Sequence, residues 1–337
     1  MFLHRLFTPG ADLAYHDGII MMFGTIAAAI APVFLLLLLG MFLRWRDFPG
    51  GDFWRGADRI SYWVLFPALL FNKISGLDIS SALMTSVAVP IYAGFFTSFG
   101  FALLAGLVWG FSAPLRTSLL QGASRHNTFI ALALAELLFG AEGLAYATLV
   151  SAFLIPITNI ALVAAMVIML REHHERGGGL IVALFRDMGR NPLLMGLTAG
   201  FLVNGLGLYP LYVVTPVTDI LGRAALPMML LSVGANFVVG KPKALFLPLF
   251  VTIVGKMVIF PVVVVAIAVL MGVPGPILAV LAIFGCVPTA PSGYALARAM
   301  GGDAPAMANI VTFHTALGLI TLPLSLLCIY AWFGLGP

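Results

Sequence analysis

Two polar interruptions within long apolar stretches carry the side chains that could bind a small solute. The later one lies in the range 284–301, where Pro288 and Pro291 straddle Ala290. Proline removes a backbone N–H and glycine tolerates unusual backbone angles, so we expect a helix break at about 288–293. Broken backbone is tolerated in hydrocarbon only where it is buried in protein or lines a cavity, and the freed helix ends can hold a solute. We therefore expect two roles here: Pro288, Pro291 and Gly293 shape the backbone, and Thr289 and Ser292 line the site.

The earlier interruption is the polar run 124–128, Ser-Arg-His-Asn-Thr. Arg125 and His126 could complement a carboxylate, the arginine through a bidentate pair. Asn127 and Thr128 are the strongest candidates for substrate contact. In a simpler interpretation, Asn127 and Thr128 cap a broken helix and the two basic residues face the interface. Capping and ligand contact can coexist.

Ionisable and amide groups inside apolar stretches are costly and are therefore functional candidates. Lys256 should meet a carbonyl, an acidic partner or the substrate, and we count it among the candidate substrate contacts. Asp219 and Arg223 are four residues apart, which predicts a structural pair on one helix face. Three further groups could couple transport to an ion or serve as structural hydrogen-bonding groups: Glu136, His314 and Asn159.

The composition predicts an all-α membrane protein that crosses the bilayer many times. Hydrophobic residues make up 61% of the 337 and charged residues 9%, with a mean hydropathy of +1.09. Soluble domains carry about a quarter charged residues, and one crossing needs roughly 20 apolar residues, which leaves room for about ten. The ten expected spans are 20–43, 60–74, 84–109, 118–139, 144–170, 192–208, 214–239, 244–271, 276–300 and 304–333.

Several classes of function find no support in the sequence. The net charge of +4 forms no basic stripe, so it does not indicate a nucleic-acid partner. No phosphate-binding loop, HExxH or GxSxG motif is present, which argues against ATP-driven transport, hydrolysis and a cofactor. The adjacent His173 and His174 do not converge on one helix face, so we expect no metal site. Cys286 and Cys328 both fall in apolar segments, which does not indicate a disulfide framework.

Charge in the loops predicts the orientation. Lys and Arg gather in the links that follow odd-numbered spans, so these links should be cytoplasmic and both termini periplasmic. The chain should divide into a first five-helix repeat at 1–170, a cytoplasmic amphipathic linker at 171–190 and a second five-helix repeat at 191–337.

An internal repeat follows from matches at a nearly constant offset. Gly40 and Gly200 are 160 residues apart, as are two proline pairs, and Thr128 and Thr289 are 161 apart. Because each half holds five spans, the second copy must be inverted relative to the first. Spans 4 and 9, which carry the two interruptions, would then cross near the midplane, and the positive N-terminal helix ends there favour an anion. The matching proline pairs are Pro32 with Pro192 and Pro67 with Pro227.

Four segments resemble the bacterial members of the auxin efflux carrier family. They are GASRHNTFIALALAELLFG (122–140), NPLLMGLTAGFLVNGLGL (191–208), AALPMMLLSVGANF (224–237) and PTAPSGYALARAMGGD (288–303). The resemblance implies ten spans in an inverted five-plus-five repeat, with a transport domain of spans 3–5 and 8–10. The scaffold would be spans 1, 2, 6 and 7, and would form a homodimer. Family members move organic anions, including auxin in plants and malonate-type dicarboxylates in bacteria. The link between halves is about 20 residues, which favours a bacterial carrier.

These observations together predict a secondary transporter of small organic carboxylates in a bacterial inner membrane, working by alternating access. A proton or sodium ion could be co-transported. The alternative is a sodium-coupled symporter of the bile-acid type, but such a protein should cluster oxygen ligands beside the crossing, and the second interruption is poor in them. An intramembrane enzyme is disfavoured because His126 and His314, its only candidate groups, have no evident acidic partner.

Overall fold

The protein is all-helical in the computed structural model, which describes residues 12–170, 189–237 and 246–333. The predicted linker at 171–190 and both ends of the chain lie largely outside these residues. In chain order the elements are α2 (Asp12–Trp45), α3 (Gly51–Ile60), η1 (Ser61–Leu65), α4 (Phe66–Ser75), α5 (Ser81–Val108), α6 (Ala113–Ser124), α7 (Thr128–Met169), α9 (Pro192–Gly205), α10 (Val214–Ala235), α11 (Phe246–Ile253), η3 (Val254–Ile259), α12 (Phe260–Leu270), α13 (Gly275–Cys286), α14 (Ser292–Met300) and α15 (Ala304–Phe333).

Six helical stretches in the described part of the chain are long and apolar enough to cross a membrane. They are Ile26–Trp45, Ser81–Val108, Ala113–Met169, Val214–Ala235, Phe246–Leu270 and Ala304–Cys328. The third has 57 residues, far more than one crossing of about 30 Å needs at 1.5 Å per residue. It is interrupted between α6 and α7, and α7 itself kinks at Gly140, whose φ is 62°. These findings confirm a multi-pass, all-helical membrane protein.

The link between the first two expected spans, 20–43 and 60–74, contains the helix α3, which we did not predict from the sequence. This helix places Asp52 and Arg59 on an exposed face and buries Trp54 and Ala57 on the other. It continues through the π-helical turn η1 into α4. Charge density alone indicated a loop, whereas the spacing of the two buried residues suits one face of a helix.

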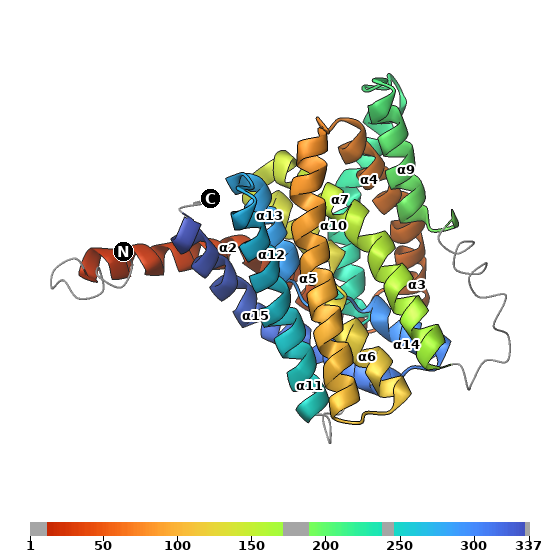
Figure 1. Cartoon of the computed structure of the whole chain (residues 1–337). Helices are drawn as coiled ribbons and strands as arrows, with labels where there is room; N and C mark the ends of the chain where they lie inside the picture. The colour runs from red at the N-terminus through yellow and green to blue at the C-terminus, as the bar shows by residue number, and fades with distance from the viewer. Residues whose placement is uncertain (1–11, 171–188, 238–245, 334–337) are drawn as a thin grey trace.

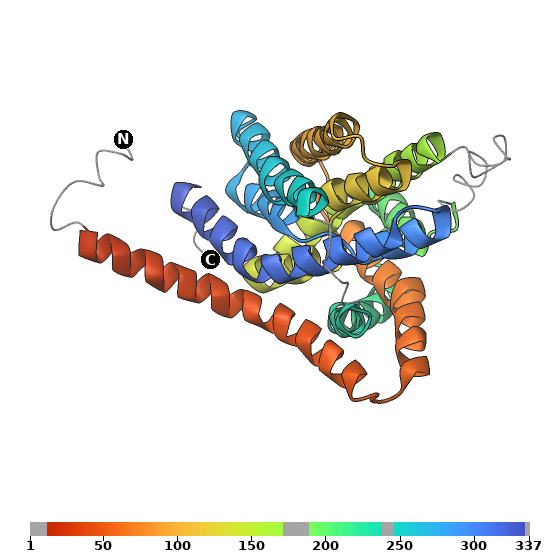
Figure 2. The same ribbon diagram turned by 90° about the horizontal axis from the view of Figure 1, so that it is seen from below.

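Helix α2 packs along α10 and α15 at one edge of the molecule, and its N-terminal end projects away from the other helices (Figures 1 and 2). Helices α4 and α9 lie side by side elsewhere in the bundle. Glycine makes the α2–α10 approach possible: a side chain at Gly40 would bring its Cβ within 2.0 Å of the Leu231 carbonyl oxygen. Small residues at such positions let backbones approach closely in membranes.

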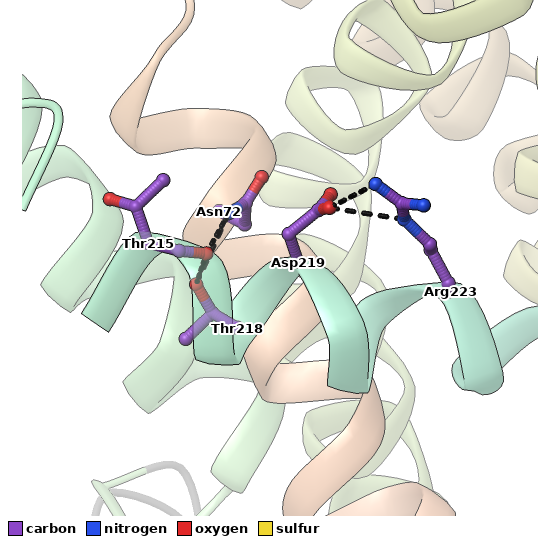
Figure 3. Close-up of polar contacts among 5 residues, drawn as sticks. All are labelled: Asn72, Thr215, Thr218, Asp219 and Arg223. Carbon is purple, nitrogen blue, oxygen red and sulfur yellow. Dashed lines mark hydrogen bonds and ion pairs between the residues drawn. The ribbon is translucent and has the colours of Figure 1, made fainter. Parts of the chain in front are cut away.

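Two polar contacts on α10 are shown in Figure 3. Asn72 of α4 donates from Nδ2 to the Thr215 carbonyl and to Thr218 Oγ1, both at 3.1 Å, and so ties α4 to α10. On the next turns Arg223 donates to Asp219 from Nε at 3.0 Å. The predicted i,i+4 pair is therefore confirmed, and it is a local contact within one helix.

Candidate functional site

The helices that carry the two polar interruptions end beside one another. Helix α6 ends at Ser124 and α7 begins at Thr128, while α13 ends at Cys286 and α14 begins at Ser292. The backbone N–H of Asn127 donates to the Pro288 carbonyl at 2.9 Å, so the two non-helical segments are joined directly. The Asn127 side chain also caps α7, because its Oδ1 accepts from the Ile130 N–H at 3.2 Å. The capping role predicted for this residue is present.

A cavity of about 590 Å³ lies beside these segments. Its wall combines residues from both segments with residues from α3, η1, α7, α9, α10 and α14. Six residues that we singled out in the sequence share this wall: Arg125, His126, Thr128, Asn159, Pro291 and Ser292. Much of the remaining lining is apolar and includes Phe129, Ile155, Leu193 and Met229. A mostly apolar pocket with a few converging polar groups is typical of small-molecule sites.

Arg125 supplies the cavity with a guanidinium that has no carboxylate partner among the described residues. Its Nη1 donates to Gln121 Oε1 at 3.1 Å and its Nη2 to Asn159 Oδ1 at 2.9 Å. Both partners are neutral amides, and they use two of the five N–H donors of the side chain. The described chain contains two ion pairs, Arg55–Asp52 and Arg223–Asp219, and neither involves Arg125. The guanidinium is therefore oriented by its neighbours and not neutralised by them.

Several buried polar atoms near Arg125 lack a hydrogen-bond partner within the described chain. Both ring nitrogens of His126 are unpaired, and its ring packs 5.7 Å from that of Phe284. Thr158 Oγ1, on the same cavity wall, is unpaired as well, and so is Nδ2 of the nearby Asn127. Buried polar groups in proteins almost always have partners, so such a cluster is typical of a site that a ligand or water completes.

Several residues that we expected at the site do not line the cavity. Thr289 is fully buried; its Oγ1 donates to the Gly122 carbonyl at 2.6 Å and lies 2.9 Å from Nδ1 of His314. The other ring nitrogen of His314 lies 3.1 Å from Thr252 Oγ1. This histidine therefore links α15 to α11 and to the non-helical segment 287–291, which we call the second break. These two side chains line no part of the cavity. Three more predicted residues, Lys256, Pro288 and Gly293, are also buried outside the cavity wall, while Glu136 is exposed on α7.

Sequence reasoning missed seven polar or aromatic residues of the cavity wall, of which Phe129 and Asn191 are two. Asp58 and Asn236 meet there, with Asn236 Nδ2 donating to Asp58 Oδ2 at 2.5 Å. Burial raises the pKa of the Asp58 carboxyl, and the hydrogen bond from Asn236 acts in the opposite direction. Both residues sit at ends of apolar stretches, where a polar residue looks like an ordinary boundary. The other three are Tyr62, Thr158 and Tyr294.

Comparison with known proteins agrees with a membrane transport protein. Residues 180–326, a little under half of the chain, match a family model described as membrane transport protein. Over this stretch the chain is similar to that family. The family is one of transporters and not of enzymes, which confirms the predicted class. A comparison with curated proteins found no match.

Proposed function

We propose that the protein is a secondary transporter of small organic carboxylates. They bind in the cavity beside the two helix breaks, the first at 125–127 and the second at 287–291. The observation that carries this proposal is the guanidinium of Arg125, held by Gln121 and Asn159 but paired with no carboxylate in the described chain. A cation of this kind suits a carboxylate, which can accept two parallel hydrogen bonds from it. The unpaired His126, on the same wall, can supply a further contact.

The charges on the cavity wall favour ligands with one carboxylate. Among the residues that the structure describes, Arg125 is the sole Lys or Arg on that wall, and Asp58 places a carboxyl on it. A second carboxylate on the ligand would find no second cation and would be repelled by Asp58 when that group is ionised. The apolar residues between them suit the body of such a ligand. Small monocarboxylates should therefore bind better than malonate-type dicarboxylates.

The packing of the described helices supports the inverted repeat on which alternating access depends. The carbonyl of Leu231 on α10 faces Gly40 on α2, and the carbonyl of Phe71 on α4 faces Gly200 on α9, 3.0 Å from where a Cβ would lie. An offset of 160 converts Gly40 into Gly200 and Phe71 into Leu231. The two contacts are thus images of one another, as a pseudo-two-fold relation between halves requires.

In this proposal the chain crosses the bilayer ten times, with spans 4 and 9 broken and crossed. The transport domain (spans 3–5 and 8–10) moves against the scaffold (spans 1, 2, 6 and 7) to expose the cavity alternately to each side. Asp58 and Asn236 lie near links that carry the excess of Lys and Arg, so the cavity in this structure would be accessible from the cytoplasm. The bacterial inner membrane, periplasmic termini and a homodimer through the scaffold stay predictions.

Ligand-dependent melting of the purified protein tests this function. A panel of mono- and dicarboxylates should be added at two pH values, with and without sodium, and the Tm recorded. We expect a monocarboxylate to raise the Tm of the wild type and to have no such effect on Arg125→Gln. Uptake of that carboxylate into proteoliposomes should show the same dependence. Stabilisation by sodium alone, with no response to any carboxylate, would instead favour the sodium-coupled alternative.

A further inference from the structure

Lys256 is a fully buried lysine that the proposed carboxylate site does not use. It lies in the π-helical segment η3, between α11 and α12, and none of its surface is exposed. Its Nζ donates to the carbonyl oxygens of Phe284 and Gly285, both at 3.2 Å. The same atom lies 4.1 Å from the centre of the Phe260 ring. The described residues provide no carboxylate within ion-pair distance of it.

The two carbonyls that Lys256 contacts are left open by the break itself. Within a helix the Phe284 carbonyl would accept from the N–H of residue 288, four positions later. Residue 288 is a proline and has no N–H, and α13 ends at Cys286 before the Gly285 carbonyl can be paired in turn. Pro288 thus leaves one carbonyl without a donor and the end of α13 leaves another, and Lys256 supplies a donor to both.

The surroundings of Nζ suit a cation better than a neutral amine. The last carbonyls of a helix carry partial negative charge, which attracts cations. The face of an aromatic ring also attracts an ammonium, most strongly where water is excluded. Carbonyl oxygens at the C-terminal ends of broken helices are the ligands that coordinate alkali-metal ions in several transporters. In this chain an ammonium on a side chain occupies that kind of position.

We propose that the Lys256 ammonium is a resident, covalently tethered cation of the second break, and that it takes the structural place of a bound alkali-metal ion. Lys256 is thus a positioning residue: it holds the end of α13 and, through the Asn127–Pro288 hydrogen bond, the geometry of the first break. The consequence for function, which rests on the carboxylate transport proposed above, is that the cycle requires no sodium at this break. Removing the side chain should create a vacant cation site.

Melting of the purified protein without added carboxylate tests the proposal independently of transport. The Tm of the wild type should be the same in sodium, potassium and choline chloride at equal ionic strength. Lys256→Ala should melt at a lower temperature, and sodium ions or methylammonium should raise its Tm by about 2–4 °C relative to choline. Lys256→Gln keeps N–H donors but has no charge, and should be destabilised without gaining the cation response.

Lys73→Met is the matched control. It removes a partly buried lysine on α4 that does not bond to the carbonyls at the end of α13. It should not acquire a cation-dependent Tm. A wild-type Tm that rises specifically with sodium would overturn the proposal, and this measurement holds even if the Lys256 variants fail to fold. A Lys256→Ala protein that folds but responds equally to all three salts and to methylammonium would overturn it as well. Failure of the carboxylate proposal would appear separately, as a wild type that no carboxylate stabilises.

Discussion

The two breaks are joined by hydrogen bonds from Asn127 to Pro288 and from Thr289 to Gly122, but they are built in opposite ways. At the first break, neutral hydroxyls satisfy the last carbonyls of α6: Thr289 donates to Gly122 at 2.6 Å and Ser98 to Ala123 at 2.7 Å. At the second, the ammonium of Lys256 satisfies the last carbonyls of α13. The first break directs its own cation, Arg125, toward the cavity, whereas the segment 287–291 contains no ionisable side chain.

This difference teaches that two helix breaks that lie side by side need not share the same chemistry. The first break has charge available for a ligand because hydroxyls are sufficient to cap its helix end. The second break uses its cation internally, so it contributes shape through Pro291 and contact through Ser292 but no charge. We infer that the first break binds the ligand and that the second break holds the backbone of the site in place. The following variants test that division, from the largest expected effect to the smallest.

Arg125→Gln should weaken carboxylate binding most, by about 10- to 100-fold, because a charge-assisted hydrogen bond is worth roughly 1.5–3 kcal/mol. Isothermal titration with the carboxylate that stabilises the wild type would measure this. Arg125→Lys should recover part of the affinity, since it restores the charge without the planar fork. Arg223→Gln, which removes an arginine paired on the exposed side of α10, is the control and should bind normally. Equal losses in both glutamine variants would contradict a binding role for the first break.

Asn127→Ala should abolish transport while leaving membrane insertion intact. The variant loses both the N-cap of α7, worth about 1 kcal/mol, and the unpaired Nδ2 beside the cavity. Asn127→Ser separates the two roles, because serine can cap the helix but brings no amide. Proteoliposome uptake should remain low in the serine variant while its Tm recovers. Full uptake in Asn127→Ser would reduce this residue to a helix cap.

Thr289→Val should lower stability more than affinity. The variant removes the hydrogen bond to the Gly122 carbonyl and the contact with His314, at a cost of about 1–3 kcal/mol for buried groups left unpaired. Because Thr289 does not line the cavity, the dissociation constant of the carboxylate should change less than about threefold. Parallel Tm and titration measurements would test this. A large loss of affinity at unchanged Tm would place Thr289 in the ligand site.

Asp58→Asn should have the smallest effect and should act through pH. Burial raises the pKa of this carboxyl, so the folded protein holds its proton more tightly than the unfolded chain. Its contribution to stability is therefore present at low pH and is lost as pH rises through the folded-state pKa. Asp58→Asn should flatten the fall of Tm between about pH 4 and neutrality and should strengthen carboxylate binding a few-fold at neutral pH. A Tm–pH curve identical to that of the wild type would contradict the raised pKa.

The broad organisation could be predicted from the sequence because it depends on local rules. Apolar length predicts crossings, and proline within an apolar stretch predicts that a helix stops, as it does at Cys286 before Pro288. The helix ends around 287–291 follow from proline, and those around 125–127 follow from the polar run 124–128. The amphipathic helix α3 was missed because its charged face dominated its composition.

The roles of individual site residues were harder to predict because they depend on which way a side chain points. Thr128 and Thr289 each lie in one of the two polar interruptions, yet Thr128 lines the cavity and Thr289 bonds to the Gly122 carbonyl outside the cavity wall. Asp58 and Asn236 are 178 positions apart, and only the packing of α3 against α10 brings them together. One sequence offers no local signal for such a meeting.

The most direct test of the account is an experimental structure of the protein bound to the carboxylate that best stabilises it. We predict the carboxylate in the cavity between the two breaks, within about 3 Å of the Arg125 guanidinium, with Lys256 still bound to the Phe284 and Gly285 carbonyls. A carboxylate bound to Lys256, or bound away from both breaks, would contradict the division between a binding break and a supporting one.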